Sequence, residues 1–192
     1  GSHYLELLLT HYLIKKEQWI LDKAAHFLRN CKAWRAADLC WDNRGSRTTE
    51  SPWMQTQLIT AILRWYEFAP SLAENFPVDD VLKSGEAIWT LGHHVDDGKP
   101  LLYYRFRGKT QKAPAMHLTA FAVPMLKYMA AYDSKWRKTH KEVRDCVFDW
   151  AGTDAVGVRS GSKTPISDLG YRFPREGLGW AKALRMYLEG AR

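Results

Sequence analysis

The chain has 192 residues, of which 46% are hydrophobic, so it can form one folded domain with a sizeable core. No apolar run is long enough for a membrane-spanning helix, so we expect no membrane insertion. Lys and Arg total 28 against 21 Asp and Glu, and the formal charge of +7 predicts an anionic partner. An acidic polysaccharide, a nucleic acid and an anionic membrane surface all fit, and a solvated basic surface without a partner is the alternative.

The first half of the chain begins with a predicted helical hairpin. Residues 4–14 and 17–30 carry apolar side chains at helical spacing, with a turn expected near Lys15-Lys16. Residues 37–52 are rich in turn-forming residues and predict a long polar loop.

The next predicted helix, residues 52–68, has clear start signals. Ser51 is a good N-cap and Pro52 suits the first helical position. Because its apolar residues lie nearly all round, this helix should be covered on most sides. Asp79 is expected to cap a further helix over residues 80–92, which has a narrower apolar stripe.

A second long connection, residues 93–114, predicts a β-hairpin. Asp97-Gly98 is a hairpin-type turn, and residues 101–106 form a plausible short strand. A mostly apolar helix is then expected over residues 115–132, with a kink at Pro124.

The remaining sequence predicts two helices separated by a long loop. Residues 134–150 are apolar on one side only, with Ser134 as the expected cap. Residues 151–174 are rich in Gly and Ser, and a last helix is expected from Pro174 to Leu188.

These elements form a weak repeat of roughly 60 residues: a long loop, a covered helix and a one-sided helix. The pattern is typical of an all-α fold, an incomplete α/α toroid of helical hairpins with a small β-hairpin in one loop. The loops at 37–52, 93–114 and 151–174 would then gather around one cleft. The amino ends of the inner helices would meet there, each worth roughly 0.3–1 kcal/mol to an anion.

The ends and cysteines add little about function. Residues 1–3 resemble a tag scar, and residues 4–192 are expected to form a single domain, with a fragment of a longer protein as one interpretation. No signal peptide is visible, so the compartment stays open; a periplasmic or secreted location would apply to a longer chain. Cys31, Cys40 and Cys146 contain no CxxC pair, so neither a disulfide framework nor a zinc ribbon is expected.

Two segments resemble a known family. The sequence "SPWMQTQLITAILRWYEFAPSLAENFPVDDVLKSGEAIWTL" at residues 51–91 is similar to the "PW-SGMAQGQALS-L-R-YE" segment of D-glucuronyl C5-epimerase C-terminal domains. Residues 95–133 resemble the hairpin and "VLNGHIFALFGLYDY" stretch that follows. The resemblance implies a toroid fold and an acidic glycan as the substrate class. The family's glycines are absent at 53–57, and Met116-His117-Leu118-Thr119 replaces "LNGH".

The candidate site residues follow from the chemistry of acidic sugars. Hydrolysis needs two carboxyl groups, whereas a lyase or epimerase needs a base for the C5 proton and cations for the resulting carboxylate. For catalysis we single out His117 and Tyr171 as bases and Glu50 as an acid; for substrate binding we single out Trp53 and Tyr104 as sugar platforms, Gln55 as a hydroxyl ligand, and Arg105 and Arg172 as carboxylate clamps. A structural histidine, core packing of Trp53 and helix capping by Gln55 are the alternatives.

The leading hypothesis is a carbohydrate-active domain that binds or acts on an acidic polysaccharide through lyase, hydrolase or epimerase chemistry. No cofactor is expected, and no metal site, since neighbouring residues of "HHVDD" (93–97) rarely all reach one ion. The surplus of aromatic residues, nine Trp and nine Tyr, fits rings that stack on sugars or bases. The alternatives are a non-catalytic helical binding or assembly module, and a nucleic-acid binder that uses the basic residues 135–141.

Overall fold

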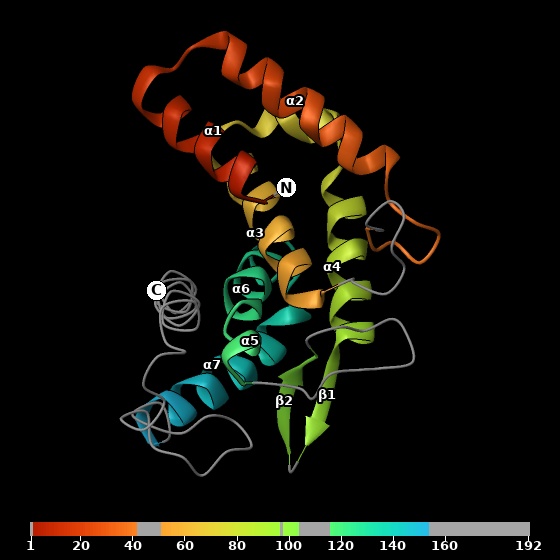
Figure 1. The fold of residues 1–192 in the computed structure, drawn as a ribbon, viewed down its shortest axis with the longest axis vertical. Coiled ribbons are helices and arrows are strands. Elements are labelled where there is room, and N and C mark those ends of the chain that lie inside the picture. The colour runs from red at the N-terminus through yellow and green to blue at the C-terminus, as the bar shows by residue number, and fades with distance from the viewer. Residues whose placement is uncertain (1, 42–50, 97, 104–115, 154–192) are drawn as a thin grey trace, which may run out of the picture. The chain divides into compact units, whose positions relative to one another are not determined.

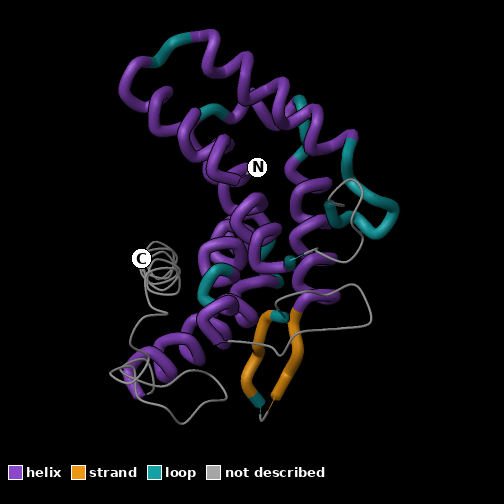
Figure 2. Tube along the Cα trace, viewed as in Figure 1, coloured by secondary structure: helices purple, strands orange, loops and turns teal. Residues whose placement is uncertain are grey.

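The structure is a computed structural model that describes residues 2–41, 51–96, 98–103 and 116–153. These residues are mostly helical, and they include a small two-stranded antiparallel sheet (Figures 1 and 2). The mostly helical fold and the small hairpin predicted from the sequence are thus confirmed. The described residues up to Gly92 form one compact unit and those from His93 onward form a second.

The first unit is built around one central helix. Its elements are α1 (Ser2–Lys15), α2 (Gln18–Ala33), α3 (Pro52–Phe68), the short 3-10 helix η1 (Pro70–Glu74) and α4 (Val78–Gly92). Helix α3 contacts α1, α4 and η1, and α1 also pairs with α2 (Figure 1). The predicted hairpin over α1 and α2 and the covered position of α3 are both confirmed.

The burial of α3 explains its unusual composition. Ile59, Ile62 and Leu63 are fully buried, and so is Trp65. The indole N–H of Trp65 donates a 3.0 Å hydrogen bond to the backbone carbonyl of Leu5 in α1. A helix contacted from several sides needs apolar residues all round, and the polar N–H of the buried Trp65 ring has a hydrogen-bond partner.

Helix α4 begins earlier than the sequence predicted. It starts at Val78, so Asp79 lies in the first turn and is not the cap. Asp80 follows it in the same turn and forms ion pairs with Lys32 (3.8 Å) and Arg35 (3.5 Å). Acidic side chains are favoured in a first turn because the helix end is electropositive, which accounts for the earlier start.

The second unit opens with the hairpin of β1 (His93–Asp96) and β2 (Lys99–Leu102). His93 pairs with Leu102 and Asp96 pairs with Lys99, which leaves a two-residue connection containing Gly98 at φ 71°. The predicted turn is confirmed. Leu101 and Leu102 of the strand predicted at 101–106 lie in β2, which begins earlier, at Lys99, whereas residues 104–106 lie outside the described residues.

Helix α5 (Met116–Thr119) and helix α6 (Ala122–Tyr132) replace the single helix predicted over residues 115–132. The predicted kink at Pro124 is wrong, because the helix is interrupted earlier, at Ala120 and Phe121 between α5 and α6. Pro124 is the third residue of α6, where a backbone N–H has no acceptor within the helix, so its missing donor costs little.

Helix α7 (Trp136–Thr153) contacts α5, α6 and β2. It begins two residues after Ser134, so the predicted cap at that position is wrong. The carboxylate of Asp133 instead accepts a 3.0 Å hydrogen bond from the backbone N–H of Lys135. Within the described ranges, no helix combines the length and apolarity needed to cross a membrane.

Candidate functional site

The structure places only part of the predicted site. Trp53 and Gln55 lie in the first turns of α3, where their side chains are described. His117 lies in the single turn α5, but its side chain is outside the described part. The remaining predicted residues lie outside the described ranges altogether: Glu50, Tyr104, Arg105, Tyr171 and Arg172. Their convergence on one cleft therefore stays a prediction.

The amino end of α3 is the positive end of a helix dipole. Ser51 occupies the N-cap position, and its carbonyl accepts hydrogen bonds from the N–H groups of Met54 (3.1 Å) and Gln55 (3.3 Å). The first turn contains no acidic residue. Trp53 is half-buried there, and Met54 is 55% exposed. The positive end of the helix dipole therefore has no carboxylate from its own first turn beside it.

The side chain of Gln55 binds the segment that precedes α3. Its amide nitrogen donates to the carbonyl of Trp41 (3.0 Å), and its amide oxygen accepts from the N–H of Trp41 (3.1 Å). Both polar ends of Gln55 are thus occupied in this structure, and the side chain is buried. We refer to this pair of hydrogen bonds as the Gln55 clasp.

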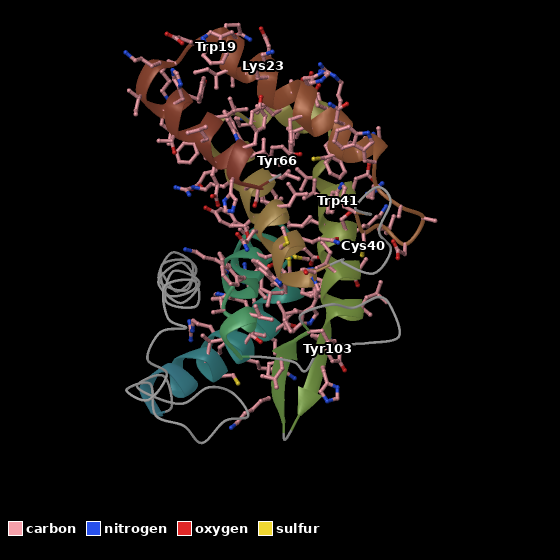
Figure 3. All side chains as sticks on the ribbon, viewed as in Figure 1. Trp19, Lys23, Cys40, Trp41, Tyr66 and Tyr103 are labelled. Carbon is pink, nitrogen blue, oxygen red and sulfur yellow. The ribbon has the colours of Figure 1, made fainter. Side chains whose placement is uncertain are left out.

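Trp41 is held from two further directions. Its indole N–H donates to the carbonyl of Cys31 (2.8 Å), and its ring stands edge-on to Phe76 with centroids 6.3 Å apart (Figure 3). Trp41 also forms an isolated β-bridge with Arg35. The segment 34–41 is consequently a closed turn attached to α2, to α3 and to Phe76, which lies between η1 and α4.

Arg35 is the basic residue of this turn, and its charge is already balanced. Its guanidinium lies 3.5 Å from the carboxylate of Asp80, and it donates to the carbonyl of Asp80 (2.9 Å) and the hydroxyl of Ser84 (3.3 Å). It also lies over the ring of Phe76, 5.4 Å from the centroid. Arg35 therefore anchors the turn to α4. Neither Arg35 nor Trp41 was singled out from the sequence, because these contacts leave no spacing pattern.

Thr56 and Gln57, two further buried polar residues, donate to a backbone oxygen of their own helix. The hydroxyl of Thr56 donates to the carbonyl of Trp53 (2.9 Å), and the amide of Gln57 reaches the same oxygen at 3.4 Å. Both side chains are buried. These contacts restrain the backbone of the first turn and therefore the position from which the Trp53 side chain extends.

The hairpin of the second unit exposes a smaller aromatic surface. The rings of His94 and Tyr103 lie 5.6 Å apart at 35°. His94 and Val95 are exposed. Among the residues that the structure describes, no three His, Cys, Asp or Glu side chains are grouped so as to hold a metal ion.

The basic residues at the start of α7 are partly neutralised. Lys135 lies 3.5 Å from Asp133 and over the ring of Trp136, and Lys138 lies 3.8 Å from Glu142. Pairing of this kind weakens the electrostatic footprint that nucleic-acid binding needs, so the solvated-surface interpretation is favoured.

The thiols of the first unit are buried. Cys31 and Cys40 both lie in the core, whereas Cys146 in α7 is half-buried, and none of the three forms a disulfide bond. Burial raises the pKa of the Cys31 thiol from 9.0 to about 12, so this group stays protonated and is not a reactive thiolate.

No protein-family model, curated protein or solved structure matches this chain. The case for a function therefore rests on the residues and contacts described above.

Proposed function

We propose that the chain belongs to an incomplete α/α toroid that binds an acidic polysaccharide, with the amino end of α3 at the sugar-binding surface. In a toroid, covered inner helices direct their amino ends into a common cleft. The central position of α3, in contact with α1, α4 and η1, supports this assignment of α3 as an inner helix.

The observation that carries the proposal is the construction of the first turn of α3. It presents the half-buried ring of Trp53 next to an electropositive helix end without acidic residues, and the Gln55 clasp attaches the neighbouring turn to it. A flat ring stacks on the face of a sugar, and the helix end favours a carboxylate by roughly 0.3–1 kcal/mol. The net charge of +7 favours the approach of a polyanion.

The other substrate-binding residues of the proposal are the predicted clamps Arg105 and Arg172 and the platform Tyr104. We further propose lyase, hydrolase or epimerase chemistry at this site. His117 and Tyr171 are then the bases and Glu50 is the acid. Binding and catalysis make separate predictions, so they are tested separately.

Binding is tested with a panel of acidic glycans, which includes uronate polymers and sulfated polymers, measured by calorimetry against a neutral glycan. We expect Trp53→Ala to weaken binding about tenfold or more, because loss of one stacked ring costs on the order of 1–3 kcal/mol. Phe68→Ala is the matched control, since Phe68 is an aromatic residue at the opposite end of the same helix and is 42% exposed. The proposal is wrong if no acidic glycan binds, or if the two variants lose affinity equally.

Catalysis is tested on the same panel by following the ultraviolet absorbance of unsaturated uronate products, together with reducing ends and C5 proton exchange with solvent. Binding without any of these signals would restrict the function to recognition. Product formation that survives in both His117→Ala and Tyr171→Phe would refute the assigned bases.

A further inference from the structure

Helix α1 has apolar side chains on two opposite sides. Leu5, Leu8 and Leu9 are buried against the rest of the first unit. On the other side Leu7 is 68% exposed and Ile14 is 71% exposed. Large apolar side chains exposed on the side of a helix away from its buried side mark a candidate interaction surface.

The spacing of the exposed residues indicates what kind of partner fits. Tyr4, Leu7, His11 and Ile14 follow one another at intervals of three, four and three residues, and we call them the outer face of α1. This is the a/d spacing of a coiled-coil seam over two heptads, which receives the side chains of another helix.

We propose that the outer face of α1 is a self-association surface that pairs with the same face of a second copy of this chain. In an antiparallel two-fold arrangement, Tyr4 would face Ile14 of the partner subunit and Leu7 would face His11 of the partner subunit. Tyr4 and Ile14 then form apolar contacts, Leu7 packs on an imidazole ring, and each contact occurs twice, as in an isologous interface. The helix and its turn carry charges of both signs, Glu6 and Glu17 against Lys15 and Lys16, so two copies do not repel each other strongly.

The ring of Trp19, labelled in Figure 3, lies in the first turn of α2 and next to His11 of the outer face. It is 47% exposed, yet its indole N–H donates to the carboxylate of Glu17 (2.6 Å), and its centroid lies 5.4 Å from that of the His11 ring with the two planes at 83°. His11 also lies 3.7 Å from Glu17. A large aromatic ring held in place before binding loses little freedom on association, which is the property of an interface anchor.

The available area is sufficient for a weak dimer. The outer face and Trp19 together supply five side chains that are about half exposed, each on the order of 200 Å² when open, which gives roughly 500 Å² per copy. Two copies would bury roughly 1,000 Å², the lower limit for a specific interface. We therefore expect a reversible dimer with a dissociation constant in the micromolar range.

The test is sedimentation velocity of the full chain between about 1 and 100 µM, the range in which a micromolar dimer forms. The mass is expected to rise from 22.2 kDa toward twice that value as concentration increases. Leu7→Glu/Ile14→Glu should remain monomeric throughout, a weakening of at least tenfold. Leu91→Glu, at an exposed leucine of α4, is the matched control and should dimerise like the original chain.

Circular dichroism checks that the variants keep their helices, which is expected because Leu7 and Ile14 are exposed and Glu is a good helix former. Should the double glutamate variant lose helicity, Leu7→Gln/Ile14→Gln provides the same test without added charge. A chain that stays monomeric at about 100 µM overturns the proposal, as does dimerisation unaffected by either double variant or equally weakened by Leu91→Glu.

Discussion

The Gln55 clasp makes a quantitative prediction about the first unit. Gln55→Leu keeps most of the side-chain volume but removes both hydrogen bonds to the backbone of Trp41. Because Trp41 is half-buried, water can replace only part of what its N–H and carbonyl groups lose. Gln57→Leu is the matched control, since Gln57 is buried in the same helix but makes only one long contact, 3.4 Å, to the carbonyl of Trp53.

The expected magnitude follows from the number and quality of the bonds. Each hydrogen bond contributes a net 0.5–1.5 kcal/mol, and a buried backbone group left without a partner costs about 1–3 kcal/mol. Two bonds of 3.0 and 3.1 Å, with partial rescue by water, give a loss of about 2–3 kcal/mol for Gln55→Leu. The single long contact of Gln57 gives less than about 1 kcal/mol for Gln57→Leu.

Urea unfolding followed by circular dichroism measures the two free-energy changes at equal m-values. Hydrogen exchange gives a local readout, since the N–H of Trp41 should lose protection in Gln55→Leu and keep it in Gln57→Leu. Equal destabilisation by the two substitutions, or unchanged protection of the Trp41 amide in Gln55→Leu, would refute the clasp as the element that attaches segment 34–41.

Two further predictions concern a backbone conformation and a buried thiol. Gly98→Ala should destabilise the hairpin by about 1 kcal/mol, measured by exchange of the β1–β2 amides, because Gly98 has φ 71° although a Cβ there would meet no atom within 4 Å; Gly98→Asn should cost less. Burial raises the pKa of the Cys31 thiol from 9.0 to about 12, so the folded state keeps a proton that the unfolded chain releases. The stability due to this group is present below pH 9 and is lost as pH rises toward 12, by up to 1.36 kcal/mol per pH unit. The urea midpoint should therefore fall less between pH 8 and pH 10.5 in Cys31→Ala than in the original chain. Cys146→Ala is the control, and equal falls in Cys31→Ala and Cys146→Ala would contradict this assignment.

The helices could be predicted because their periodicity is a local property. Apolar spacing located α1 and α2, and Ser51 followed by Pro52 fixed the start of α3 to the residue. The break between α5 and α6 could not be predicted in this way. It depends on tertiary contacts, among them the 2.9 Å hydrogen bond from the N–H of Leu102 to the hydroxyl of Thr119.

The described part of the site was less predictable than the fold. Gln55 was chosen as a ligand for sugar hydroxyls because it lies at the start of a covered helix. Its actual partners are main-chain atoms of Trp41, and a main-chain partner leaves no residue type for sequence reasoning to detect. Arg35 was overlooked for a related reason, since its role depends on Asp80 and Phe76, which lie far along the chain.

The hydrogen bond between the indole of Trp65 and the Leu5 carbonyl has a consequence for the orientation of α1 against α3. Helix α1 has leucines on two opposite sides. The free energy of burying apolar surface therefore differs little between the two orientations of the helix about its axis that bury one side or the other. The indole N–H of Trp65 in α3 favours the observed orientation, because a rotation of α1 about its axis would move the Leu5 carbonyl away from this donor, which it meets at 3.0 Å. This hydrogen bond thus acts together with the burial of Leu5, Leu8 and Leu9 to leave Leu7 and Ile14 on the exposed side of α1.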